Sequence, residues 1–148
     1  MIALVQRVLH ASCTVEGKKI SDIRKGLLAY VGIDMEDAMQ NAHKMAEKIV
    51  NVRLFEDEQG KMNRSLLDTG LEIMVIPNFT LSGYLESRRP SFSTAKPKQE
   101  AEPLYQELCA AIEKHMPCKR GLYAGDMTID ARVDGPVNLI IKIQENGK

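Results

Sequence analysis

The chain has 148 residues, of which 44% are hydrophobic and 27% are charged, a size and balance typical of one globular domain, which we expect to span residues 1–148. Twenty basic and twenty acidic residues cancel, which excludes an overall positive field, so that any RNA contact must come from a local patch. No apolar stretch reaches the ~20 residues that span a bilayer, and Arg7 interrupts the first apolar run; we therefore expect no membrane segment, no signal peptide and a cytoplasmic location.

The cysteines and histidines form no metal-binding pattern. Cys13, Cys109 and Cys118 are odd in number and lack the spacing of a zinc site, which favours free thiols in a reducing compartment. The three histidines are scattered along the chain. We expect no metal and no cofactor.

Strand patterns dominate the first third of the chain. Residues 2–8 alternate and are rich in apolar and β-branched side chains, which predicts a strand. Residues 14–20 predict a hairpin that turns at Gly17-Lys18. The nearly continuous apolar run over 26–33 is typical of a strand that is covered on both faces.

A helical pattern follows. Apolar residues recur at three- and four-residue spacing over 35–50, which predicts an amphipathic helix with Asp34 as its cap. A charged turn over 56–61 and the short segment 65–68 come next. They lead into an apolar run over 71–76, which we predict to be a buried strand.

The second half holds one more helix and two more strand patterns. Residues 82–98 contain proline, serine, threonine and arginine and predict an extended surface connection. A second helix is predicted over 99–115, and Pro117 ends it. Strands are predicted near 127–133 and 137–143. The apolar face of the second helix consists of Leu104, Leu108, Ala111 and Ile112.

The order of these elements indicates the fold class. Strands outnumber helices, and no connection demands a repeated βαβ unit. We therefore predict a mixed α/β fold in which two main helices flank an antiparallel-rich sheet. No internal repeat or low-complexity tail indicates a second domain.

Two short polar corners stand beside predicted strands. Pro77-Asn78-Phe79-Thr80-Leu81 follows the strand over 71–76, and Asp134-Gly135-Pro136-Val137-Asn138 overlaps the start of the last strand. Rigid scaffolds display binding and catalytic groups at such corners. A Gly-Pro bond adopts the cis form at a cost of about 0.5–1 kcal/mol, so the second corner is a candidate for exposed carbonyl oxygens. On spacing alone, two ordinary turns are the better explanation of the same residues.

Four other segments also match a known family; they are residues 1–8, 54–63, 88–93 and 125–127. Together with the two corners these segments resemble, in order and at comparable spacing, the D-aminoacyl-tRNA deacylase family, formerly D-tyrosyl-tRNA deacylase. The resemblance runs from Met1 to about Ile143. It implies a small β-barrel-like core flanked by helices, and a homodimer that hydrolyses the ester between a D-amino acid, or glycine, and the 3′ acceptor end of tRNA.

The resemblance also assigns roles to residues at the two corners. Asn78, Phe79 and Thr80 become the catalytic corner, whose backbone N–H groups stabilise an oxyanion, while Thr80 lacks a nearby base that would make it a nucleophile. Gly135 and Pro136 become a chirality filter that acts across the dimer interface and rejects L-aminoacyl-tRNA. The supporting residues implied by the resemblance are Arg7, Met127 and Asn138.

Several of these residues have a plain structural interpretation as well. Arg7 fits a solvated charge at a strand end, Phe79 fits core filling, and Met127 fits ordinary packing. Arg88 and Arg89, together with Lys96 and Lys98, are candidates for gripping tRNA phosphates, and a solvated basic loop explains them equally well.

The chain departs from the family pattern at both corners. The usual Ser-Gln-Phe-Thr is Pro77-Asn78-Phe79-Thr80, and in Asn-x-Gly-Pro-Val-Thr the outer positions are Val133 and Asn138. One hypothesis is retained deacylase activity, because main-chain donors tolerate side-chain change. The alternative is a divergent, catalytically weak paralogue that acts as a tRNA- or nucleotide-binding module. A purely structural or interaction protein is the third class.

Overall fold

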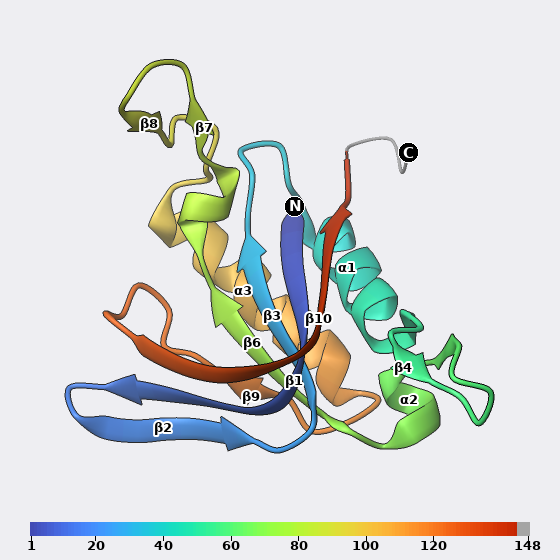
Figure 1. The fold of residues 1–148 in the computed structure, drawn as a ribbon. Coiled ribbons are helices and arrows are strands. Elements are labelled where there is room, and N and C mark those ends of the chain that lie inside the picture. Colours follow the sequence, from blue (N-terminus) through green and yellow to red (C-terminus); the bar gives the residue numbers. More distant parts are fainter. Residues whose placement is uncertain (145–148) are drawn as a thin grey trace.

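The computed structural model describes residues 1–144. Its main sheet has six strands in the spatial order β10–β1–β3–β6–β9, with β2 paired to β1. β1 pairs antiparallel with β2, β3 and β10, whereas the β3–β6 and β6–β9 pairs are parallel. The sheet curls into a nearly closed, barrel-like shape (Figure 1), which confirms the predicted fold class. Its strands are β1 (Ile2–Val15), β2 (Lys18–Ile23), β3 (Gly26–Gly32), β6 (Glu72–Pro77), β9 (Lys119–Arg120) and β10 (Thr128–Lys142).

Two main helices, α1 and α3, lie together on one face of this sheet (Figure 1). Among the residues described, no helix is long and apolar enough to cross a membrane. Two small hairpins, β4–β5 and β7–β8, stand out from the body of the molecule. The bounds of these elements are α1 (Met39–Asn51), β4 (Phe55–Glu56), β5 (Met62–Arg64), α2 (Leu66–Thr69), the 3₁₀ helix η1 (Phe79–Ser82), β7 (Tyr84–Leu85), β8 (Pro90–Ser91) and α3 (Lys98–Glu113).

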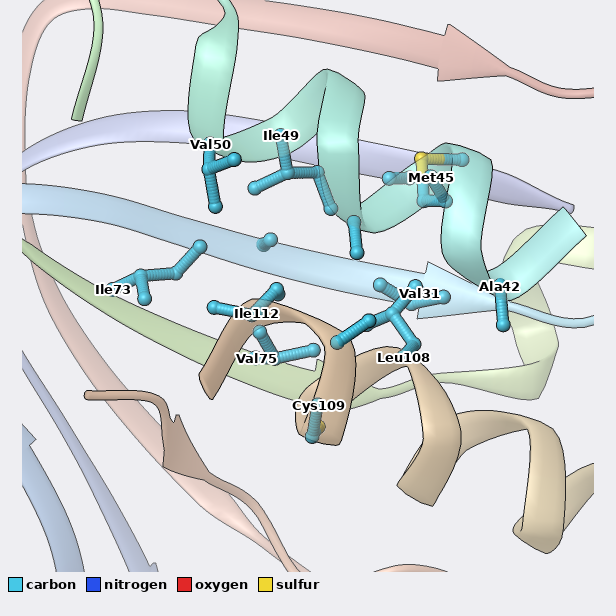
Figure 2. Packing of buried hydrophobic residues seen from close by; sticks show 14 of the residues in the cluster. Val31, Ala42, Met45, Ile49, Val50, Ile73, Val75, Leu108, Cys109 and Ile112 are labelled. Carbon is cyan, nitrogen blue, oxygen red and sulfur yellow. The ribbon is translucent and has the colours of Figure 1, made fainter. Parts of the chain in front are cut away.

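The core is divided by β3 and β6. Alternate side chains of β3, among them Val31, pack against α1 and α3, as Figure 2 shows, while Leu28 points to the opposite face and joins a second cluster with Met74. Because both faces are buried, the strand has no polar alternation. This confirms the interpretation of the run over 26–33. The predicted apolar face of the second helix is also confirmed, since Leu104, Leu108, Ala111 and Ile112 are all buried.

The prediction for the start of the first helix was wrong. α1 begins at Met39, and the side-chain oxygen of Asn41 accepts the N–H of Ala38 at 2.9 Å. Asp34 is not a cap, because its carboxylate accepts a hydrogen bond from the Met1 amino group at 3.1 Å, beside Asp37 at 2.7 Å. A contact between distant segments therefore takes the carboxylate that the local pattern assigned to the helix.

Two strand boundaries also differ from the prediction. The first hairpin turns at Glu16-Gly17, which both have positive φ, rather than at Gly17-Lys18. The two final strands are one strand, β10, that continues through the second corner. Gln6 pairs with Asn138 and Val8 pairs with Val133, so residues 134–137 bulge out while the pairing resumes on either side.

Candidate active site

A cavity of about 670 Å³ opens beside the end of β6 and η1. Its volume lies within the range of about 300–1,000 Å³ that small-molecule sites occupy. The walls come from β3, β6, η1, the segment before α3 and the loop before β10. The large apolar and aromatic side chains that line it are Tyr30, Ile33, Ile76, Phe79, Phe92, Tyr123, Met127 and Ile129.

Phe79 forms part of the wall of this cavity. Its side chain is 58% exposed, so the interpretation as core filling was wrong. The rings of Phe79 and Phe92 meet edge to face, with centroids 5.2 Å apart. A Cβ atom at Gly83 would lie 2.6 Å from the Phe92 ring, so only glycine leaves room for this arrangement.

The side chain of Asn78 caps η1. Its Oδ1 accepts the N–H of Thr80 at 3.2 Å and the hydroxyl of Thr80 at 2.5 Å. The Thr80 hydroxyl therefore donates to an amide oxygen and does not face a base. The N–H of Phe79 precedes the first turn and has no intrahelical acceptor. Of the three N–H groups of the predicted catalytic corner, that of Asn78 donates to the carbonyl of Val31 and that of Thr80 donates to the Asn78 side chain, which leaves the N–H of Phe79.

Pro77 has no N–H group, and its pairing with β3 does not need one at this position. The N–H of Asn78 donates to the carbonyl of Val31 at 2.8 Å, so the nitrogen of Pro77 faces away from β3. The corner is tight because Gly32 lies beneath it. A Cβ atom there would lie 3.0 Å from atoms of both Leu81 and Ser82. The departure from the family pattern at Pro77 therefore leaves the strand pairing intact.

Arg7 holds the second corner from behind. Its side chain is only 10% exposed, so the interpretation as a solvated charge was wrong. Nη1 donates to the carbonyl of Leu54 at 2.9 Å, and Nε lies 3.2 Å from Oδ2 of Asp134 in an ion pair without hydrogen-bond alignment. The Gly135-Pro136 bond is cis, and Gly135 has φ of +124°.

The structure does not bring the two corners together within one chain. Asn78, Phe79 and Met127 line the cavity, whereas Gly135 and Pro136 do not. The first corner ends β6 and the second interrupts β10, with β1 and β3 between them in the sheet. Three strand spacings correspond to about 14 Å.

Four of the other predicted residues lie outside the cavity, whereas Lys96 and Lys98 line it. Asn138 is exposed on β10, and Thr80 is exposed on η1. Arg88 and Arg89 are exposed at the tip of the β7–β8 hairpin, which projects from the molecule near η1 (Figure 1).

Sequence reasoning missed three aromatic residues of the cavity wall. Tyr30, Phe92 and Tyr123 all line it. Burial raises the pKa of the Tyr30 phenol, with a contribution from nearby Cys13, and burial likewise raises the pKa of Tyr123, so both phenols keep their protons. Phe92 lies within the matching segment 88–93, and that was the one signal that pointed to it.

The match to known proteins covers nearly the whole chain. Residues 4–142 match the family model described as D-Tyr-tRNA(Tyr) deacylase. The D-aminoacyl-tRNA deacylase of Dichelobacter nodosus is 43% identical over 145 residues, which are 97% of this chain and 100% of that protein. The enzyme of Thermodesulfovibrio yellowstonii is 44% identical over 143 residues, 95% of this chain and 98% of that protein.

Solved structures agree with this result. One described as "c-Myc DNA Unwinding Element Binding Protein" superposes with a TM-score of 0.93 at 36% identity, covering 98% of this chain and 100% of that one. Another, described as a probable eukaryotic D-amino acid tRNA deacylase, shares the fold with a TM-score of 0.78 at 14% identity, over 95% and 97% of the two chains. The chain therefore belongs to the D-aminoacyl-tRNA deacylase family, and it is a hydrolase that acts on the ester bond of D-aminoacyl-tRNA.

Proposed function

We propose that the cavity receives the aminoacyl end of the tRNA and that the N–H of Phe79 stabilises the oxyanion. Water attacks the ester carbonyl, the negative charge develops on its oxygen, and the ribose oxygen leaves with a proton. The products are the free D-amino acid and tRNA. The observation that supports this role is an N–H group without an intrahelical acceptor, on a residue whose ring lines the cavity.

In this proposal the side chains of Thr80 and Asn78 shape η1, and neither is a nucleophile. An aminoacyl ester is already activated, so the site needs oriented water and a fixed donor rather than a side-chain nucleophile. The Asn78 amide holds the first turn of η1 in place through Thr80. Met127 and Phe79 are proposed to contact the substrate through the apolar wall.

We further propose that Gly135 and Pro136 reject L-aminoacyl esters across a homodimer. Their carbonyl oxygens would accept a hydrogen bond from the substrate amino group and leave no room for an L side chain. Glycine has no side chain, so glycyl-tRNA would pass the same filter. Such a filter acts without regard to the identity of the D side chain. Arg7 would hold the filter in place, and we propose that the enzyme works in the cytoplasm, where charged tRNA is used.

Two observations support a second copy as the partner. The two corners lie on separated strands of one chain, so a single chain would leave the pocket without its filter. β10 is also an edge strand, and Val133, Leu139 and Ile140 on it are 38% to 60% exposed. Exposed apolar residues on a sheet edge favour contact with another chain.

The proposed donor is tested by removing one N–H group. Phe79→Pro deletes it at the first position of η1, where proline is tolerated, and the preceding Asn78 is extended rather than helical (φ −148°, ψ 93°). Phe79→Leu is the control, because it loses the ring and keeps the N–H. We expect D-tyrosyl-tRNA hydrolysis to fall about 10²–10³-fold more in the proline variant than in the leucine variant. Equal rates in the two variants would refute the donor role.

The filter is tested by mixing two variants. Gly135→Ala should hydrolyse L-tyrosyl-tRNA, whereas Phe79→Pro should hydrolyse every ester about 10²–10³-fold more slowly than the wild type. If the filter acts in trans, excess Phe79→Pro chains pair with Gly135→Ala chains and restore rejection of the L-ester while D-ester and glycyl-ester hydrolysis continue. Persistent L-ester hydrolysis in the mixture would show a filter that acts within one chain.

A second candidate function is nucleic-acid binding with little turnover. It is favoured by the Asn78 side chain, which occupies the Thr80 N–H. A relative with 36% identity is described as binding a DNA unwinding element. Tight binding of D-tyrosyl-tRNA without release of the amino acid would support this candidate, and multiple turnover would exclude it.

A further inference from the structure

Two lysines are among the residues that line the cavity, and we refer to them as the rim lysines. Lys96 belongs to the segment that joins β8 to α3, Lys98 is the first residue of α3, and both line the cavity. This segment is fixed to the end of β3 and the turn after it. The N–H of Lys96 donates to the carbonyl of Ile33 at 2.9 Å, and the N–H of Met35 donates to the carbonyl of Thr94 at the same distance. The lysines therefore have a defined position beside the cavity.

Neither lysine is neutralised by a carboxylate. Within residues 1–144, ion pairs engage Lys19, Arg7, Arg64 and Arg120, but none involves Lys96 or Lys98. The one carboxylate among the residues that line the cavity is Asp126, on the loop before β10. The rim thus combines an apolar chamber with two cations that have no partner of opposite charge in the described chain.

From this arrangement we infer that Lys96 and Lys98 bind the phosphate on the 5′ side of the terminal nucleoside of tRNA. The inference rests on the proposed function, which places that nucleoside and its amino acid in the cavity. An apolar chamber suits a nucleoside, and lysine at its rim supplies charge to the adjoining phosphodiester. Such a contact positions the substrate and carries no base specificity, as suits an enzyme whose substrates differ in sequence elsewhere.

The arginines of the β7–β8 hairpin have a different position. Arg88 and Arg89 lie at the hairpin tip and do not line the cavity. Any phosphate that they reach belongs to a nucleotide farther from the ester. We therefore expect substitution of the lysines, and not of the arginines, to change how the enzyme responds to the phosphate on the 5′ side of the terminal nucleoside.

Small substrates separate the phosphate from the rest of tRNA. We would compare the D-tyrosyl ester of adenosine with the D-tyrosyl ester of 5′-AMP, for the wild type and for Lys96→Met and Lys98→Met. Lys114→Met is the matched control, since Lys114 is exposed at the opposite end of α3. Thermal unfolding checks that each variant is folded.

We expect the wild type to prefer the phosphorylated ester by about tenfold in kcat/KM, with each rim variant losing most of this preference. Hydrolysis of the adenosine ester should stay unchanged in both. Added salt should slow hydrolysis of the phosphorylated ester less in the rim variants than in the wild type, because salt screens the attraction between lysine and phosphate. Lys114→Met should behave as the wild type. Absence of a phosphate preference in the wild type, or a preference that survives in both rim variants, would overturn the inference.

Failure of the proposed function has a separate signature. If the wild type hydrolyses neither ester, the catalytic proposal fails, and binding of adenosine and 5′-AMP by calorimetry decides the lysine site. Tighter binding of 5′-AMP that is lost in Lys96→Met and Lys98→Met would support the site. Equal binding of the two ligands would overturn it.

Discussion

The corner at 77–81 and the bend at 134–137 are both short interruptions at the edge of a strand, but they are built in opposite ways. The corner encloses space: its backbone is bonded to β3, and Phe79 meets Phe92 across the wall of a cavity. The bend is anchored from behind by Arg7 and presents Gly135 and Pro136 outward. The corner therefore lines a cavity within the chain, whereas the bend is exposed and lies outside that cavity.

The anchor of the bend gives the largest expected effect. Arg7→Met leaves the carboxylate of Asp134 and the carbonyl of Leu54 without their cation, and we expect unfolding free energy to fall by about 2–3 kcal/mol. Arg64→Met is the control, since Arg64 pairs with Glu58 at an exposed site and should change stability by less than about 1 kcal/mol. Urea unfolding measures both, and equal losses would mean that burial of Arg7 adds nothing.

The shape of the bend should matter more for selectivity than for stability. Gly135→Ala forces an L residue to φ of +124° and brings its Cβ within 2.6 Å of the Val137 nitrogen. We expect a stability loss of about 1–2 kcal/mol and a marked drop in the ratio of D- to L-ester hydrolysis. Gly60→Ala is the control, because Gly60 also has a positive φ, +78°, but no atom lies within 4 Å of a Cβ added there. If the control lost as much selectivity as Gly135→Ala, the bend would not be the source of the preference for D-esters.

At the corner, the cap competes with the proposed chemistry. In Asn78→Gln the longer side chain no longer fits the turn that occupies the Thr80 N–H, so a second donor becomes free. We expect kcat to rise about tenfold, a fraction of the 10²–10³ that one donor contributes, and stability to fall by about 1 kcal/mol. Thr80→Val removes only the hydroxyl and should leave kcat near the wild-type value. A lower kcat in Asn78→Gln would contradict this prediction and would mean that catalysis needs the hydrogen bond between Asn78 and Thr80.

The wall of the cavity gives the smallest effect. Phe92→Leu loses the edge-to-face contact with Phe79, and the expected stability loss is about 0.5–1 kcal/mol, accompanied by a higher KM at unchanged kcat. Tyr84→Leu changes an aromatic residue of the same segment that does not line the cavity, and its KM should not change. A fall in kcat in Phe92→Leu would contradict this prediction, because it would mean that the Phe92 ring contributes to the chemical step and not only to substrate binding.

The fold was predictable wherever burial leaves a local pattern. The apolar run over 26–33 and the spaced apolar face of α3 record directly which sides are covered. The single strand β10 was not predictable, because a Gly-Pro pair normally ends a strand, and only pairing with β1 on both sides of the bulge carries it through. The prediction that Asp34 caps α1 was wrong for the same reason, since the carboxylate of Asp34 binds the amino group of Met1, which is distant in sequence.

The candidate site was predictable to a similar extent. Asn78, Phe79 and Met127 meet at one cavity, as expected of residues in the matching segments. The burial of Arg7 has no local signature, since a lone arginine in a strand normally points to solvent, and its partner Asp134 is reached only through the β1–β10 pairing. Tyr30 reads as core because aromatic residues in buried strands usually are core.

The partnership of β1 and β10 also determines when the molecule can fold. These strands come from opposite ends of the described chain, and β1 is the only strand that β10 contacts in the ladder. During synthesis β1, β2 and β3 can associate early, but the side of β1 that receives β10 stays open until almost the whole polypeptide has left the ribosome. Contacts of such long sequence separation slow folding. We therefore expect a nascent chain that stops before residue 128 to expose the unpaired edge of β1, which favours aggregation and binding by chaperones and proteases.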